Sequence, residues 1–123
     1  MLTDLQKAQE EGIAPWKDIY VDTRDYTVFV DGFPVTEGHL LFVPKIYDLD
    51  TVLKCYKVAH QMGNDNVKSQ QWDGYNIGMN MGEAAGQTVM YPHIHLIPRR
   101  KGDCENPRGG VRHVIPGKGY YNA

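Results

Sequence analysis

The chain of 123 residues is long enough for one domain with a single hydrophobic core but too short for two. Its hydrophobic fraction of 41% and charged fraction of 23% are ordinary for a globular protein, which argues against a disordered chain. A net charge of -2, with no run of like charge longer than Arg99-Arg100-Lys101, argues against a nonspecific nucleic-acid or membrane-surface binder but allows a local site for a small phosphorylated ligand.

The first part of the chain predicts one short helix and three strands. Residues 3–11 favour a helix that begins at Thr3 as N-cap and ends before Gly12 and Pro15. Residues 17–22 and 26–31 are rich in Ile, Tyr, Val and Phe, which predicts two strands joined by a turn at 23–25. After a turn region at 32–38, the apolar run within 39–43 predicts a third strand that is buried on both faces.

The second part predicts a long helix followed by two strands. Asp48 and Asp50 offer caps for a helix that runs to about residue 70. Its apolar face at spacings of three and four comprises Leu49, Val52, Leu53, Tyr56, Ala59 and Met62. Residues 74–80 and 93–98 predict two strands around a glycine-rich stretch at 82–86, and the tail from residue 101 is expected to be an ordered loop rather than strand or helix.

Most of the predicted strands are joined by short connections, which favour antiparallel neighbours. The expected fold class is therefore α+β, with an antiparallel sheet of about five strands and one long helix packed on one face. The N-terminal segment has no apolar core of a signal peptide, and no stretch approaches the ~18 apolar residues of a membrane span. Cys55 and Cys104 form no C-x-x-C motif and fit a reducing compartment better than a disulfide framework, although one long-range bridge stays open. We expect a cytoplasmic protein without membrane attachment.

His93 and His95 are the candidate chemical residues of the last strand. In an extended segment they project to the same face, about 7 Å apart, while Ile94 and Leu96 face the other way. Such a pair can ligate a metal, act as a nucleophile with a supporting group, or simply lie on a polar surface. A metal site needs further ligands, and Arg99 and Arg100 stand where a cupin-type site has a glutamate. These cations favour an anionic ligand such as phosphate.

The loop before this strand also favours an anion. Gly82 and Gly86 allow tight turns whose amides can face a phosphate, and Asn80, Gln87 and Thr88 add neutral donors. A glycine-rich loop can equally serve only to turn the chain, so this signal is modest by itself.

Three segments together resemble the histidine triad (HIT) family, nucleotide hydrolases and transferases with the motif His-φ-His-φ-His-φ-φ. Asp31 to Lys45 is similar to the family's first hairpin, Tyr75 to Arg100 to its active-site hairpin, and Gly102 to Arg112 to the tail of bacterial members related to diadenosine polyphosphate hydrolases. The resemblance covers about residues 17–116. It implies a single domain over 1–123, with a core at about 17–100, a tail at 101–123 and a homodimeric assembly.

The resemblance also implies roles for individual positions. His93 falls on the nucleophile that attacks the α-phosphorus and becomes nucleotidylated, while His95 and His39 fall on supporting or phosphate-contacting histidines. Asp31 falls on the residue that binds the ribose hydroxyls. The phosphate-loop positions are Asn80, Gln87 and Thr88.

Tyr91 departs from the motif, because it replaces the first histidine and precedes Pro92. A tyrosine can donate a hydrogen bond near the substrate or the nucleophile, but it cannot become cationic at neutral pH. The Cys-x-x-Cys zinc site of some relatives is also missing, so no structural metal is expected. No cofactor is expected to be required, and a divalent cation such as Mg²⁺ is expected only in company with a polyphosphate substrate.

The sequence therefore predicts an enzyme that cleaves the α-phosphate bond of adenine-type dinucleoside polyphosphates or nucleoside phosphoramidates, without nucleic-acid partners. A nucleotide-binding protein with little or no turnover is the alternative, and a metal-binding H-x-H protein is a third hypothesis for which the sequence supplies no complete ligand set. Several residues have two interpretations. Base stacking or core packing is open for Trp16, Tyr20, Phe29 and Phe33. His60 fits a surface histidine of the helix better than a functional one, and His113 can line the pocket. Arg108 and Arg112 can reach the phosphates or brace the tail.

Overall fold

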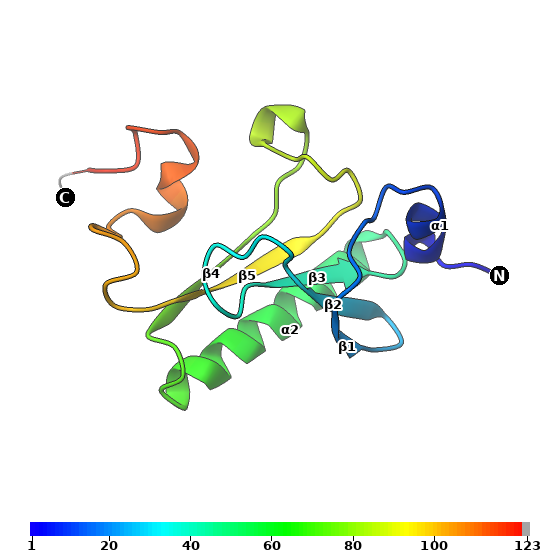
Figure 1. Ribbon diagram of the computed structural model, residues 1–123, viewed down its shortest axis with the longest axis horizontal. Helices are drawn as coiled ribbons and strands as arrows, with labels where there is room; N and C mark the ends of the chain where they lie inside the picture. The colour runs from blue at the N-terminus through cyan, green and yellow to red at the C-terminus, as the bar shows by residue number, and fades with distance from the viewer. Residues whose placement is uncertain (122–123) are drawn as a thin grey trace.

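An antiparallel sheet of five strands forms the centre of the structure, a computed structural model that describes residues 1–121 (Figure 1). The strands are β1 (Ile19–Asp22), β2 (Tyr26–Val30), β3 (Leu40–Pro44), β4 (Gly74–Gly78) and β5 (Ile94–Arg99). Their order is β1-β2-β3-β5-β4, and every neighbouring pair is antiparallel. The expected α+β class is confirmed.

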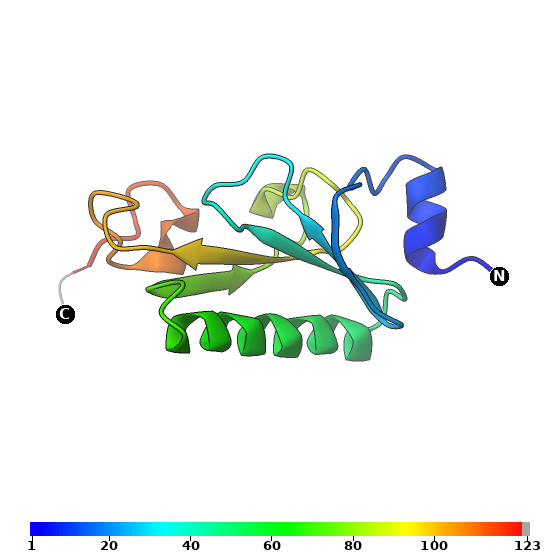
Figure 2. The same ribbon diagram turned by 60° about the horizontal axis from the view of Figure 1, so that its bottom comes forward.

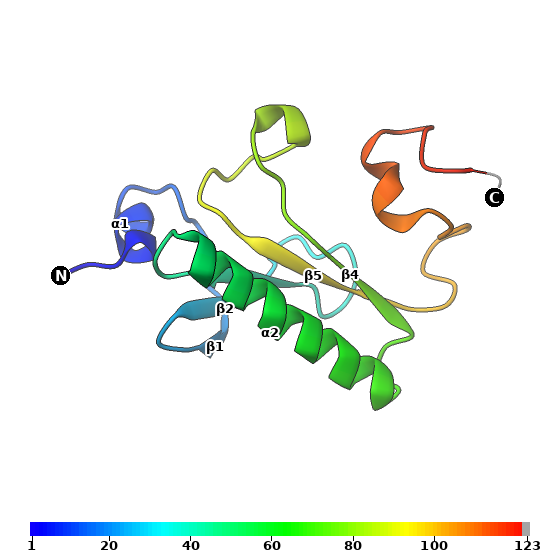
Figure 3. The same ribbon diagram turned by 180° about the vertical axis from the view of Figure 1, so that it is seen from behind.

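The long helix α2 (Leu49–Lys68) covers one face of this sheet (Figures 2 and 3). It begins at Asp48, whose side chain accepts a hydrogen bond from the Thr51 amide at 2.8 Å. The helix buries a small residue at every fourth position. These residues, Cys55, Ala59 and Gly63, lie on one face and let the helix approach the strands closely. A Cβ at Gly63 would lie 2.7 Å from the Tyr75 ring of β4.

The prediction that Leu49 and Leu53 belong to the buried face of the helix is wrong. Leu49 and Leu53 are 71% and 54% exposed, whereas Val52, Tyr56 and Met62 pack against the core. Successive helical residues turn by about 100°, so Leu53 leaves the face that Val52 begins. The helix also ends at Lys68, slightly before the expected end. None of the helices within residues 1–121 is long and apolar enough to cross a membrane.

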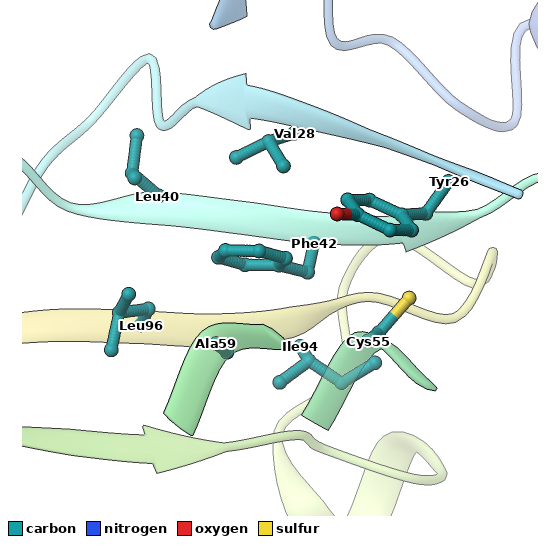
Figure 4. Packing of buried hydrophobic residues seen from close by; sticks show 8 residues of the cluster. All are labelled: Tyr26, Val28, Leu40, Phe42, Cys55, Ala59, Ile94 and Leu96. Carbon is teal, nitrogen blue, oxygen red and sulfur yellow. The ribbon is translucent and has the colours of Figure 1, made fainter. Parts of the chain in front are cut away.

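The two faces of the sheet divide its side chains by simple alternation. Toward α2, residues of β2, β3 and β5 form a core with Cys55 and Ala59; they are Tyr26, Val28, Leu40, Phe42, Ile94 and Leu96 (Figure 4). The intervening residues Phe29, Leu41 and Val43 pack on the opposite face against the short helix α1 (Asp4–Glu10). As expected, β3 is buried on both sides. His95 alternates with Ile94 and Leu96 and therefore belongs to the face opposite α2.

The C-terminal tail is not the pure loop that the sequence predicted. Residues Gly110–Val114 form a 3-10 helix, η2, that rises on the face opposite α2 together with the loops that precede β3 and β5 (Figure 2). The His113 ring packs so closely on Gly119 that a Cβ there would lie 2.1 Å from Nδ1. Arg108 and Arg112 both lie over the Tyr121 ring, and Arg112 donates to the Gly119 carbonyl. These two arginines brace the tail.

Candidate active site

Adjacent strand ends bring the predicted site residues together on the face opposite α2. Asp31 follows β2 and His39 precedes β3, and the Asp31 amide donates to the His39 carbonyl at 3.1 Å. β3 pairs with β5 in a register that sets Leu41 opposite His95. Strand pairing therefore places His95 beside His39, and the His93 and His95 rings lie 5.1 Å apart.

His93 is held in one tautomer by a backbone acceptor. Its Nδ1 lies 2.8 Å from the carbonyl oxygen of Tyr91, and a carbonyl can only accept. Nδ1 therefore carries the proton of the neutral ring, and the lone pair is on Nε2. The ring is 8% exposed and packs against the Trp16 ring, with centroids 4.8 Å apart. The arrangement fixes the direction in which a nucleophilic nitrogen can act.

His39 and His95 form a second hydrogen-bonded unit. The Val35 amide donates to His39 Nδ1 at 3.2 Å, so the proton of His39 is on Nε2. That nitrogen lies 2.9 Å from His95 Nδ1 and 3.3 Å from Asp31 Oδ2. Because His95 Nδ1 accepts, Nε2–H of His95 is left as a donor. The other oxygen of Asp31 accepts from the Phe33 amide at 2.7 Å, which orients the carboxylate.

Burial keeps both of these imidazoles neutral at pH 7. Desolvation, with the neighbouring charges of His93 and His39, lowers the pKa of His95 from 6.5 to about 4. Burial also lowers the pKa of His39, and the Asp31 carboxylate opposes that shift only in part. The unit therefore presents neutral donors and acceptors rather than a positive charge.

The loop between β4 and β5 is stabilised from within by Gln87. Its Oε1 accepts from the Gly82 amide at 2.8 Å, and its Nε2 donates to the carbonyls of Val89 and Met90. Gly82 and Gly86 have φ of 93° and 88°, values that favour glycine. The buried Gln87 amide thus braces the loop instead of facing a ligand, while Thr88 on the same loop is exposed.

Tyr91 lies in the protein interior and does not reach the substrate side. It is 7% exposed, and its hydroxyl donates to the Pro44 carbonyl at 2.6 Å. Burial raises the pKa of this phenol. The expectation that its side chain binds substrate or holds the nucleophile is therefore corrected, because the group that holds His93 is the Tyr91 backbone carbonyl.

A pocket of about 680 Å³ opens beside the histidines, within the usual range for small-molecule sites. His39 and His95 line one side, and Asn80 lines it after the end of β4. The tail closes the other side with Val111 and Val114, which the sequence analysis did not place there, and with His113, for which it left a pocket position open. A single 3-10 turn is too short to leave a periodic signal, so the sequence could not have placed this wall.

The remaining candidates lie in different surroundings. Phe29 is buried in the core beside Trp16, whereas Tyr20 and Phe33 are 58% and 93% exposed, so they are not core residues. His60 is exposed on α2. The two arginines after β5 are also engaged elsewhere: Arg99 pairs with Asp103 at 2.8 Å, and Arg100 donates to the Glu37 carbonyl.

Tyr91→Phe tests the interior place of this tyrosine. The change removes the donor to a buried carbonyl, so we expect the free energy of unfolding to fall by about 1–3 kcal/mol. Urea denaturation with an unchanged slope measures the loss. Tyr20→Phe, at an exposed site, is the matched control and should change stability by less than about 0.5 kcal/mol. Equal stability of Tyr91→Phe and the wild type would contradict the hydrogen bond to Pro44.

The lowered pKa of His95 predicts that the stability of the protein depends on pH. An unfolded histidine binds a proton near pH 6.5, but the folded one binds it only near pH 4. The stability contributed by neutral His95 is therefore complete above pH 6.5 and declines as the pH falls toward 4. Urea unfolding at stepped pH should show a shallower decline in His95→Gln than in the wild type. Parallel curves for the two proteins would contradict the shift.

Comparison with known proteins places this geometry in a family. Residues 15–102 match the HIT domain model. Adenylylsulfatase HINT3 of Arabidopsis thaliana is 34% identical over 101 residues, which are 76% of this chain but only 50% of that protein. The bis(5'-adenosyl)-triphosphatase of Dictyostelium discoideum is 32% identical over 75% of this chain and 69% of its own length. A zinc-bound histidine triad family protein of Mycobacterium smegmatis superposes with a TM-score of 0.63 at 35% identity, covering 78% of this chain and 74% of that one. The chain belongs to the HIT family.

Proposed function

We propose that this protein cleaves the α-phosphate bond of adenine-type dinucleoside polyphosphates or nucleoside phosphoramidates through a covalent nucleotidyl-His93. The observation that carries the proposal is the bond from His93 Nδ1 to the Tyr91 carbonyl, which leaves the lone pair on Nε2. Two relatives support the substrate class, since one is named an adenylylsulfatase and the other a bis(5'-adenosyl)-triphosphatase.

In the first step, Nε2 of His93 attacks the α-phosphorus and forms a P–N bond. The bond from phosphorus to the leaving group breaks, and the leaving group departs with the electron pair. Charge that develops on the phosphoryl oxygens needs preorganised donors, which Nε2–H of His95 can supply. The ring of His93 keeps its Nδ1 proton, so it becomes cationic as the adduct forms.

The cationic ring of the adduct has two stabilising neighbours. The Tyr91 carbonyl accepts from Nδ1–H, and this hydrogen bond strengthens when the donor carries charge. The π system of Trp16 lies against the same ring, where it attracts a cation. In the second step, water attacks the phosphorus and the P–N bond breaks, with the electron pair returning to Nε2. The proton lost by the water passes to solvent, neutral His93 is restored, and the nucleoside monophosphate is released.

The sugar and the leaving group have separate places in this proposal. Asp31 is near His39 and offers a carboxylate to ribose hydroxyls, while the pocket lined by Asn80 and the tail takes the leaving group. The alternative, a nucleotide-binding protein with little turnover, was suggested by the missing motif histidine. Tyr91 leaves the support of His93 in place, which favours the enzyme.

Replacement of His93 tests the covalent route. Purified wild type should release AMP from diadenosine tetraphosphate or adenosine phosphoramidate, and His93→Ala should release none above background. His95→Ala removes one donor and should be slower by about 10²–10³-fold without losing the route. His60→Ala, on the far helix, should retain full activity. Near-normal turnover by His93→Ala would exclude this mechanism, and absence of turnover in a wild type that binds AMP would favour the binding protein.

Replacement of Trp16 tests the stabilisation of the cationic adduct. A cation–π contact of about 0.5–2 kcal/mol corresponds to a change of about 2- to 30-fold in adduct formation. Trp16→Leu should therefore form the nucleotidyl adduct more slowly by that factor, and Trp16→Phe, which keeps a π face, should lie between it and the wild type. Quenched-flow sampling with intact-protein mass spectrometry measures the adduct. Equal rates in the Leu and Phe variants would assign Trp16 a packing role only.

A further inference from the structure

Asp31, His39 and His95 converge on a single point although they come from the end of β2, the start of β3 and the middle of the sheet in β5. One ligand atom from each lies within 4.8 Å of the other two. His39 Nε2 is 2.9 Å from His95 Nδ1 and 3.3 Å from Asp31 Oδ2. The sequence supplied only the H-x-H pair; the structure adds a carboxylate and a further imidazole from the first hairpin.

We propose that these three residues form a binding site for a divalent transition-metal ion of the zinc type, and that the ion blocks the pocket when it binds. Zinc lies about 2.0–2.2 Å from imidazole nitrogen and carboxylate oxygen, so neighbouring ligands of a tetrahedral ion are about 3.3 Å apart. The two contacts of His39 are already close to that separation. A small movement of Asp31 or His95 completes a three-ligand face.

The donor set selects the kind of metal. Two neutral imidazoles and one carboxylate suit zinc and neighbouring transition metals, whereas magnesium prefers oxygen ligands alone. The fourth position of such a site is free for water, as in zinc sites with three protein ligands. The cations that would oppose a metal are occupied, because Arg99 is paired with Asp103 and Arg100 is bonded to the Glu37 carbonyl.

Metal binding requires one proton of His39 to move. The proton now on Nε2 must pass to Nδ1, which at present accepts the Val35 amide. Val35 is 68% exposed on the hairpin loop, so its amide can turn to water when this bond opens. The imidazole stays neutral throughout, and the exchange replaces two hydrogen bonds, the 3.2 Å bond from Val35 and the 2.9 Å bond to His95, by metal–nitrogen bonds to His39 and His95.

An ion at this point would take Asp31 away from a ribose, which is a contact that the proposed reaction needs. His95 would bind the metal through Nδ1, so its Nε2–H would stay a donor, but the positive ion would then lie beside the histidines on the side of the pocket. This consequence, inhibition, rests on the proposed function, whereas the metal site itself does not.

The binding test uses chelator-treated full-length protein titrated with Zn²⁺ by calorimetry and with Co²⁺ by visible absorption. We expect one ion per chain and the intense d–d bands of a low-coordinate cobalt site without a thiolate charge-transfer band. His39→Gln and Asp31→Asn should weaken binding by more than the roughly 10–100-fold that loss of an outer partner costs. His60→Gln and Cys104→Ser are matched controls and should bind as the wild type does. Absence of binding, or equal binding by all the variants, would overturn the site.

The activity test separates the site from its consequence. Zn²⁺ should suppress AMP release at the concentrations that fill the site, and chelation should restore it. Zinc bound at the three residues with undiminished AMP release would refute inhibition, and loss of activity on chelation would make the metal catalytic and refute it as well. If the protein hydrolyses nothing, the cobalt spectrum and calorimetry still decide whether the metal site exists.

Discussion

Packing of helix α2 against one face of the sheet is the constraint on which the rest of the structure depends. The small residues Cys55, Ala59 and Gly63 bring the helix close, and alternate residues of β2, β3 and β5 fill the space between. Successive side chains of a strand point to opposite faces of the sheet, so the neighbours of each core residue lie on the face away from the helix. The histidines lie on that other face for the same reason that Ile94 and Leu96 lie under the helix.

Hydrogen bonds to fixed backbone groups then determine the chemistry of each ring. The Tyr91 carbonyl leaves the lone pair of His93 on Nε2, and the Val35 amide places the proton of His39 on the nitrogen that faces His95. Three residues of one type thereby acquire different properties: His93 has a free lone pair, His39 is a bridging donor and His95 is an outward donor. The same inner contacts bring Asp31, His39 and His95 close enough to hold an ion, so substrate and metal would compete for shared groups.

Tyr91 and Gln87 illustrate how a motif position can contribute through its backbone or its interior contacts. The phenol of Tyr91 packs with Phe29, Leu41 and Val43 and donates to the Pro44 carbonyl, while the backbone carbonyl of Tyr91 supports His93. Gln87 satisfies one amide and two carbonyls of the glycine-rich loop. In both cases the sequence assigned to a ligand a side chain whose hydrogen-bond partners lie inside the protein. A buried polar side chain needs hydrogen-bond partners, and both side chains find theirs inside the protein, so neither is left to contact a ligand.

The sequence by itself determined the fold class, the strands, the long helix and the alternation of His93 with Ile94, because periodicity and turn residues are local signals. It also pointed to the segments of the site through the resemblance of two hairpins to the HIT family. Tertiary structure alone decided the tautomers, the pocket wall of Val111 and Val114, the contact of Trp16 with His93, and the convergence of Asp31 with His39 and His95. Each of these depends on strand register or on a single turn docking against distant residues, and no local pattern in the chain encodes such a contact.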